Sequence, residues 1–60
     1  MNKLLTISEL TEVTRLSSAT IYAYVAARKI PFIKIGSRVL FDSDEIKKWI
    51  DNRKVQTIGA

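Results

Sequence analysis

The sequence has no cysteine and no histidine. These absences exclude disulfide bonds and the common zinc sites, and with them cysteine nucleophiles and histidine acid–base chemistry. The carboxylates form no catalytic pattern, because most of them fall at expected helix starts, where capping and dipole roles account for them. A chain of 60 residues is also too short to wall off a pocket. We therefore expect no enzyme, no metal and no cofactor.

Long hydrophobic runs are also missing. No apolar run approaches the roughly 18 residues that a membrane span needs, and the start MNKLLTISEL has no small-residue cleavage site. We expect a cytoplasmic protein without membrane contact. The hydrophobic fraction of 47% is typical of a folded chain, and no linker or internal repeat interrupts it. This predicts one domain over residues 1–53, followed by a flexible tail over residues 54–60.

Acidic residues are absent between Glu12 and Asp42, although the chain carries a net charge of +4. The cations of this acid-free stretch are Arg15, Arg28, Lys29, Lys34 and Arg38. A positive stretch without acids is typical of a surface that meets phosphate groups. Chance placement in a short chain gives the same pattern, so charge alone does not decide the function.

Two helices joined by a short turn are expected first. Thr6 and Glu9 have the spacing of a capping box, which predicts a helix that ends near Thr14. Its inward residues, at spacings of three, are expected to be Ile7, Leu10 and Val13. Ser17 is the expected cap of a second helix that runs to about Ala27. Two helices separated by about three residues form a helix-turn-helix outline.

The second helix has one face without charge. Ile21 and Val25 are four residues apart and are expected to be buried together. The opposite face carries Ser18, Ala19, Tyr22, Ala23 and Ala26. A solvated helix face ordinarily carries lysine and glutamate, so small uncharged residues in a basic chain indicate a contact surface. Tyr22 either contacts a partner or packs at the edge of the core, and Tyr24 is interpreted as structural.

Pro31 ends helix formation, and two β-prone runs then flank the sequence GSR, which predicts a hairpin. A two-residue loop starting at Gly36 would oppose Lys34 to Val39. A three-residue loop would instead gather four apolar side chains on the core face, and for that reason we predict it. Those side chains are Ile33, Ile35, Val39 and Phe41.

The acidic stretch DSDE predicts the start of a third helix, capped by Asp42 or Ser43. Its buried stripe is expected to contain Ile46, Trp49 and Ile50. The predicted order is therefore helix, turn, helix, hairpin, helix. It corresponds to an α+β fold, a small winged helix-turn-helix with a two-stranded hairpin as the wing.

Four stretches, LLTISELTEV, LSSATIYAYV, KIPFIKIGSRVLF and DSDEIKKWI, together resemble the excisionase-type DNA-binding domain and cover about residues 4–50. This family is a small winged-helix group related to MerR-type regulators, and it includes phage excisionases and AlpA-like regulators. The resemblance implies that the second helix enters the DNA major groove, while the wing reaches the adjacent minor groove or the backbone. Pro31, Gly36 and Trp49 match framework positions of the family.

The residues that this resemblance and the charge pattern make candidates for DNA binding are Ser17, Ser18, Ala19, Thr20, Tyr22, Ala23, Arg28, Lys29, Lys34, Ser37 and Arg38. Small side chains permit close approach to the bases, while the cations flank the helix where phosphates lie. The sequence departs from the family at two positions. Arg15 stands where glycine is frequent, and a positive φ there would cost about 1 kcal/mol. Ala23 stands where relatives are often basic, which weakens direct base reading.

The resulting hypothesis is an excisionase-type accessory protein that binds duplex DNA and promotes site-specific recombination. Its expected partners are double-stranded DNA, an integrase or recombinase, and neighbouring copies that bind DNA cooperatively. A small AlpA- or MerR-like transcriptional regulator using the same domain is the alternative. A protein-interaction module without DNA binding is a further alternative, and the acid-free stretch argues against it.

Overall fold

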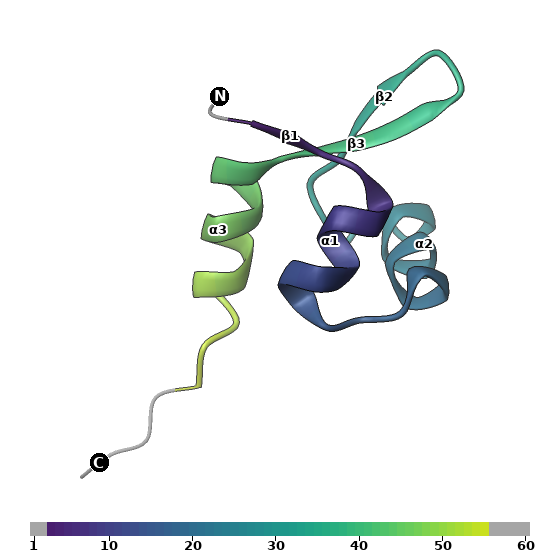
Figure 1. Cartoon of the computed structure of the whole chain (residues 1–60). Coiled ribbons are helices and arrows are strands. Elements are labelled where there is room, and N and C mark those ends of the chain that lie inside the picture. The colour runs from purple at the N-terminus through teal and green to yellow at the C-terminus, as the bar shows by residue number, and fades with distance from the viewer. Residues whose placement is uncertain (1–2, 56–60) are drawn as a thin grey trace, which may run out of the picture.

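A computed structural model describes residues 3–55 of the chain. It has three helices and a small antiparallel sheet (Figure 1), with the elements β1 (Leu4–Leu5), α1 (Ile7–Thr14), α2 (Ser18–Ala26), β2 (Ile33–Ile35), β3 (Arg38–Asp42) and α3 (Ser43–Asp51). The predicted α+β class and winged helix-turn-helix order are confirmed. Residues 56–60 of the predicted tail lie outside the described part. No helix within residues 3–55 has the length and apolar character to cross a bilayer.

The core lies where the three helices meet the sheet. Its buried side chains are Leu5, Leu10, Ile21, Ile30, Phe41 and Ile46. Each helix contributes one of them, with α1 and α3 lying against β3 and α2 against α1, so the shared burial that stabilises the domain holds the three helices and the sheet together. Phe41 lies at the centre of this arrangement, fully buried on β3.

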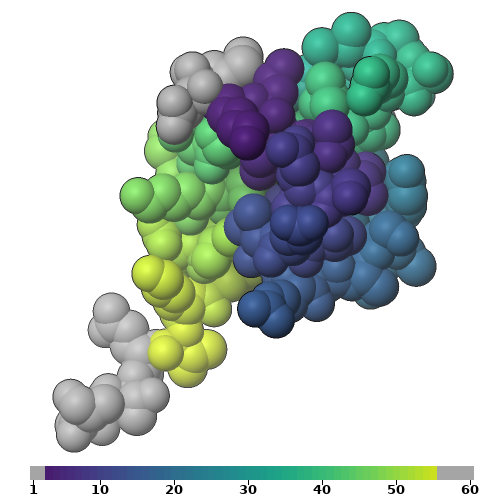
Figure 2. All heavy atoms as spheres, in the orientation of Figure 1, coloured from purple at the N-terminus to yellow at the C-terminus, as the bar shows by residue number. Residues whose placement is uncertain are grey.

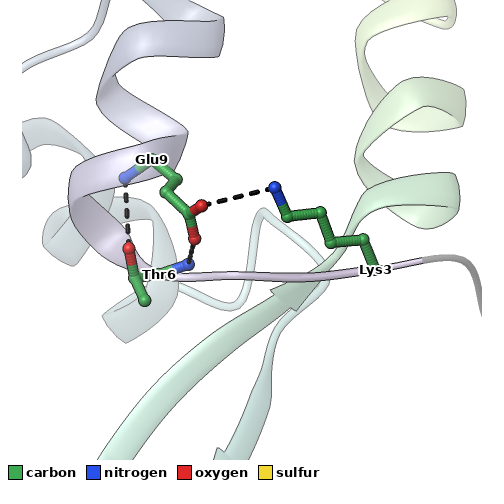
Figure 3. Close-up of polar contacts among 3 residues, drawn as sticks. All are labelled: Lys3, Thr6 and Glu9. Carbon is green, nitrogen blue, oxygen red and sulfur yellow. Dashed lines mark hydrogen bonds and ion pairs between the residues drawn. The ribbon is translucent and has the colours of Figure 1, made fainter.

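The capping box predicted at the start of α1 is present (Figure 3). The Thr6 N–H donates to the Glu9 carboxylate at 3.0 Å, and the Glu9 N–H donates to the Thr6 hydroxyl at 3.2 Å. Lys3 lies 3.5 Å from the second carboxylate oxygen of Glu9. These reciprocal bonds satisfy donors that a helix start otherwise leaves free, and they fix the direction in which α1 leaves β1.

Because the Thr6 N–H donates to its carboxylate, the pKa of Glu9 lies below its ordinary value of 4.5. A lowered pKa means that this contact stabilises the fold above about pH 4.5 and is lost as the pH falls through the folded value. We expect Glu9→Gln, which keeps an acceptor but cannot titrate, to weaken the fall in melting temperature between about pH 5 and about pH 3. Circular dichroism melts at several pH values measure this. Parallel curves for both proteins would contradict the assignment.

An arginine with positive φ follows the C-terminal end of each helix of the helix-turn-helix. Arg15 closes α1 at φ 62°, and its N–H donates to the Thr11 carbonyl at 2.8 Å. Arg28 follows α2 at φ 56°, with its N–H donating to Val25 and that of Lys29 to Tyr24, a Schellman arrangement. Arg15 thus adopts the left-handed conformation considered above, which costs a residue with a Cβ about 1 kcal/mol.

The predicted three-residue hairpin loop is wrong. Ile35 pairs with Arg38 and Lys34 with Val39, so the loop has two residues and begins at Gly36, where φ is +60°. Glycine at the first position of a two-residue loop gives a turn whose twist matches the flanking strands. Ile33 and Ile35, which we assigned to the core from β2, pair with Leu40 and Arg38 and lie outside the buried cluster, whereas Leu5 of β1 belongs to it.

Strand β1 was not predicted, and it explains the error in register. Leu5 pairs with Phe41 and Leu4 with Asp42, so β1 lies on the free side of β3 and makes the strand order β1-β3-β2. Cross-strand partners share a face, so Leu5 packs beside Phe41 on the inner face. The wing is therefore part of a three-stranded sheet rather than an isolated hairpin. A strand of two residues is too short to show alternation in a sequence.

Val13 is a second correction. We expected it to face inward, and its side chain is 54% exposed. It borders two shallow apolar hollows between α1 and α3, which it shares with Ile50. The spacing of three placed it on the side of α1 that faces α3, but α3 does not close over the last turn of α1, so Val13 stays exposed.

Candidate nucleic-acid interface

Helix α2 begins at a cap that engages two hydroxyl side chains. The Ser17 hydroxyl accepts from the Thr20 N–H at 3.2 Å and donates to the Thr20 hydroxyl at 3.0 Å. The predicted cap at Ser17 is confirmed. Because these two groups bond each other, their first role is to fix the start of α2. Ser18, which is exposed and makes no such bond, is the hydroxyl at this end best placed for an external partner.

The uncharged face predicted for α2 is exposed. Ile21 is fully buried, whereas the opposite side presents Ser18, Ala19, Tyr22, Ala23 and Ala26 to solvent. Tyr22 is 54% exposed, so it does not pack into the core. Alanine and serine extend little beyond the backbone, and another molecule can therefore approach the helix closely along this face.

The other end of α2 is held by Trp49 of α3. The indole N–H donates to the Lys29 carbonyl at 2.7 Å, and the ring makes an edge contact with Tyr24 at 5.9 Å. The guanidinium of Arg53 lies 4.0 Å above the indole. Tyr24 and Trp49 thus act as structural residues, as their sequence positions indicated. Their contacts fix the backbone from which Arg28 and Lys29 project into solvent.

A cleft of about 300 Å³ separates α2 from the wing. Three of the predicted site residues line it, Tyr22 from α2 and Ser37 and Arg38 from the hairpin. The start of α1 forms its remaining wall, with Thr6, Ile7 and Ser8. In the space-filling view the hairpin stands out as a separate lobe (Figure 2).

The start of α1 was missed as a part of this surface. Its capping box was readable in the sequence and fixed where the helix begins. Its position opposite Arg38 depends on the pairing of β1 with β3, which the sequence does not reveal. The three-residue loop would have placed Lys34 on the face of the sheet away from the core. Lys34 instead pairs with Val39 and lies on the inner face, although its side chain is exposed.

The cations of this region form no ion pair within residues 3–55. Within residues 3–55, the ion pairs are Lys3–Glu9 at 3.5 Å and Lys54–Asp51 at 3.2 Å, and both lie outside the acid-free stretch. Arg28, Lys29, Lys34 and Arg38 are all exposed, and none of them pairs with a carboxylate of the described chain. Their positive field is therefore available to an anionic partner.

The acidic residues of α3 lie apart from this surface. Figure 1 shows α2 and the hairpin on one side of the domain and α3, where Asp44, Glu45 and Asp51 stand beside Lys47 and Lys48, on the other. Residues 3–55 contain no group of acidic or other ligand side chains that could hold a metal ion. The surface of α2, its basic end and the hairpin is suited to bind a polyanion.

A family model described as a helix-turn-helix domain matches residues 4–54. The match spans all the helices and strands of the structure. No curated protein and no solved structure matches the chain.

Proposed function

Because the chain belongs to the helix-turn-helix domain family, we propose that it binds double-stranded DNA with α2 in the major groove and the β2–β3 hairpin on the adjacent minor groove or backbone. One observation carries the proposal. The exposed, uncharged face of α2 lies beside a cleft to the wing, and the cations around it have no carboxylate partner within residues 3–55. A helix of this kind fits a major groove about 12 Å wide, whose walls are lined by phosphates.

The proposed contacts divide by chemistry. Ala19 and Ala23 allow the helix to approach the base edges, and their methyl groups can contact the methyl group of thymine. Ser18 and Tyr22 supply hydroxyls for phosphates or base edges, and Ser17 and Thr20 position the start of the helix. The cations at both flanks bind phosphates, and these are Arg28, Lys29, Lys34 and Arg38. Ser37 approaches the backbone from the hairpin turn.

We further propose that the protein is an excisionase-type accessory factor in site-specific recombination. Among Ser18, Ala19, Tyr22 and Ala23 there is no arginine, lysine, asparagine or glutamine, the residues that read bases in bidentate fashion. An architectural protein tolerates such weak reading, because neighbouring copies and a partner integrase supply specificity. Sequence-dependent bending of the DNA adds more at positions that the protein does not touch.

The first test removes the cation beside the hairpin turn. Arg38→Ala should weaken DNA binding about fivefold to tenfold in 0.1 M salt, the effect of about one phosphate contact. Its melting temperature should stay within about 2 °C, because an exposed charge adds little to folding. Fluorescence anisotropy with a labelled duplex measures the affinity. Lys47→Ala, which removes an exposed cation from α3, is the matched control and should bind as the wild type does. If the wild type, Arg38→Ala and Lys47→Ala bind with equal affinity, the wing is not part of the DNA interface.

The second test separates the accessory factor from a self-sufficient regulator. A preferred site is selected from random duplexes and then offered as one copy or as adjacent copies. We expect modest selectivity for one copy, cooperative filling of adjacent copies, and tighter binding when the cognate integrase is added. Mobility-shift titrations report all of these. Tight, selective and non-cooperative binding of a monomer to one short site would favour the regulator.

A further inference from the structure

We propose that the hairpin tip, residues 35–38, enters the minor groove with Ile35 as an apolar contact, and that this contact selects groove segments free of guanine. The inference rests on the DNA binding proposed above and adds to it a second recognition element with its own base preference.

Ile35 is not part of the hydrophobic core. Its side chain is 56% exposed, and it is the last residue of β2 before the turn. It pairs with Arg38, so the isoleucine and the arginine side chains leave the same face of the hairpin. A single exposed aliphatic side chain is ordinary on a protein surface. Here its position matters, because it flanks the turn beside a cation that has no acidic partner within residues 3–55.

The minor groove is about 6 Å wide, so it admits the side chains at the tip but not the whole two-stranded ribbon. Gly36 and Ser37 are small, so the turn between the two strands is narrow. Along β3, Arg38 stands three residues, or about 10 Å, from the buried Phe41 on the side of the turn. This length exceeds the depth of the minor groove, which is about 7.5 Å. Figures 1 and 2 show that the hairpin projects beyond the helices, so the tip reaches a groove without collision by α1 or α2.

The two side chains set the base preference together. An A·T pair presents only acceptors on the minor-groove floor, and the guanidinium of Arg38 can donate to them while its charge still neutralises the phosphates that line the groove. A guanine adds an amino group that projects from the floor and needs an acceptor. Ile35 offers none, so it would cover an unpaired donor and lose the close contact. Arg38 alone would not exclude guanine, because its guanidinium can bind a phosphate of the DNA backbone instead of a base. The selectivity of the tip therefore comes from Ile35.

The test compares two DNA polymers that differ in this amino group. A hypoxanthine–cytosine pair has the major-groove carbonyl and N7 of a guanine–cytosine pair but lacks the minor-groove amino group. Poly(dI·dC) and poly(dG·dC) compete with a labelled A·T-rich duplex for the protein at fixed salt, and anisotropy gives the two inhibition midpoints. We expect wild type to bind poly(dI·dC) at least about fivefold more tightly, the lower end of the effect of one wrong base pair.

The variants assign this ratio to Ile35. Ile35→Thr keeps a β-branched residue in the strand but adds a hydroxyl that can accept from guanine, so its ratio should fall close to one. Ile35→Val should keep the ratio. Val13→Thr is the matched control, because Val13 is exposed to almost the same extent, 54%, but lies on α1 between the hollows toward α3. Its ratio should equal that of wild type.

The outcomes separate the two proposals. If wild type binds both polymers equally, or if Ile35→Thr keeps the wild-type ratio, the minor-groove contact is wrong while DNA binding stands. If Ile35→Thr instead loses self-association while its preference for poly(dI·dC) is unchanged, the exposed edge of β2 joins two copies of the protein. The proposed contact between Ile35 and the minor groove is wrong in that case too. A protein that binds none of the duplexes overturns the proposed function as well.

Discussion

DNA affinity is expected to fall about 100-fold between about 50 and about 200 mM salt. Arg28, Lys29, Lys34 and Arg38 are exposed, and none has a carboxylate partner within residues 3–55. If each neutralises one phosphate, four contacts give a log–log slope of about −3 to −4, because binding releases condensed counterions from the duplex. Anisotropy titrations at several salt concentrations yield this slope directly.

Single substitutions then show which cations contribute to the slope. Arg28→Ala or Arg38→Ala should make the slope shallower by about one. Lys48→Ala on α3, on the other side of the domain, should leave the slope unchanged although it removes the same charge (Figure 1). A flat salt response of the wild type would contradict phosphate binding by these residues. A slope that responds equally to Lys48→Ala would place the interface elsewhere.

Trp49→Ala is expected to destabilise the domain by about 3 kcal/mol, the lower end of the range for losing a large aromatic side chain, because the indole is only partly buried. The substitution removes the edge contact with Tyr24, the stacking of Arg53 and the hydrogen bond to the Lys29 carbonyl. A domain of this size has a total stability of about 3–9 kcal/mol, so the variant should lose between a third and all of it and should unfold at a clearly lower urea concentration than the wild type.

Trp49→Phe is the matched variant. It keeps an aromatic ring against Tyr24 but loses the indole N–H, so the cost should be about 1 kcal/mol, the value of one hydrogen bond. Urea denaturation monitored by circular dichroism gives both free energies. If Trp49→Ala folds as stably as the wild type, the indole does not hold the end of α2 against α3. If Trp49→Phe costs as much as Trp49→Ala, the hydrogen bond rather than the ring carries the stabilisation.

The local features of this fold could be predicted from the sequence. Thr6 with Glu9, Ser17 and Asp42 each begin a helix as expected, because a cap depends on residues only two or three positions apart. The burial of Ile21 and the placement of Tyr22 on the opposite face also follow from helical spacing. These predictions succeeded because the interactions that decide them lie within a single turn of helix.

The errors concern contacts between distant segments. Choosing the hairpin register required knowing what fills the inner sheet face, and Leu5 fills it from a strand 36 residues before Phe41. A two-residue strand leaves no periodic signal, so Ile35 was assigned to the core, whereas its pairing with Arg38 leaves it exposed beside the turn. The exposure of Val13 likewise depends on how α3 is placed. The same limit applies to the candidate surface, where helix α2 could be predicted but the wall formed by Ser8 could not.

Arginine at the two left-handed helix ends links the shape of the motif to its charge. Arg15 and Arg28 occupy backbone positions where glycine would be free of strain, and both also stand at the negative end of a helix dipole, where a cation is favourable. Backbone geometry alone therefore favours glycine at each position, whereas electrostatics favours the residue present. A substitution that relaxes either turn also removes a charge from the acid-free stretch. At these two positions, a relaxed backbone and attraction to a polyanion are therefore in conflict. Evolution or engineering can improve one there only by giving up part of the other.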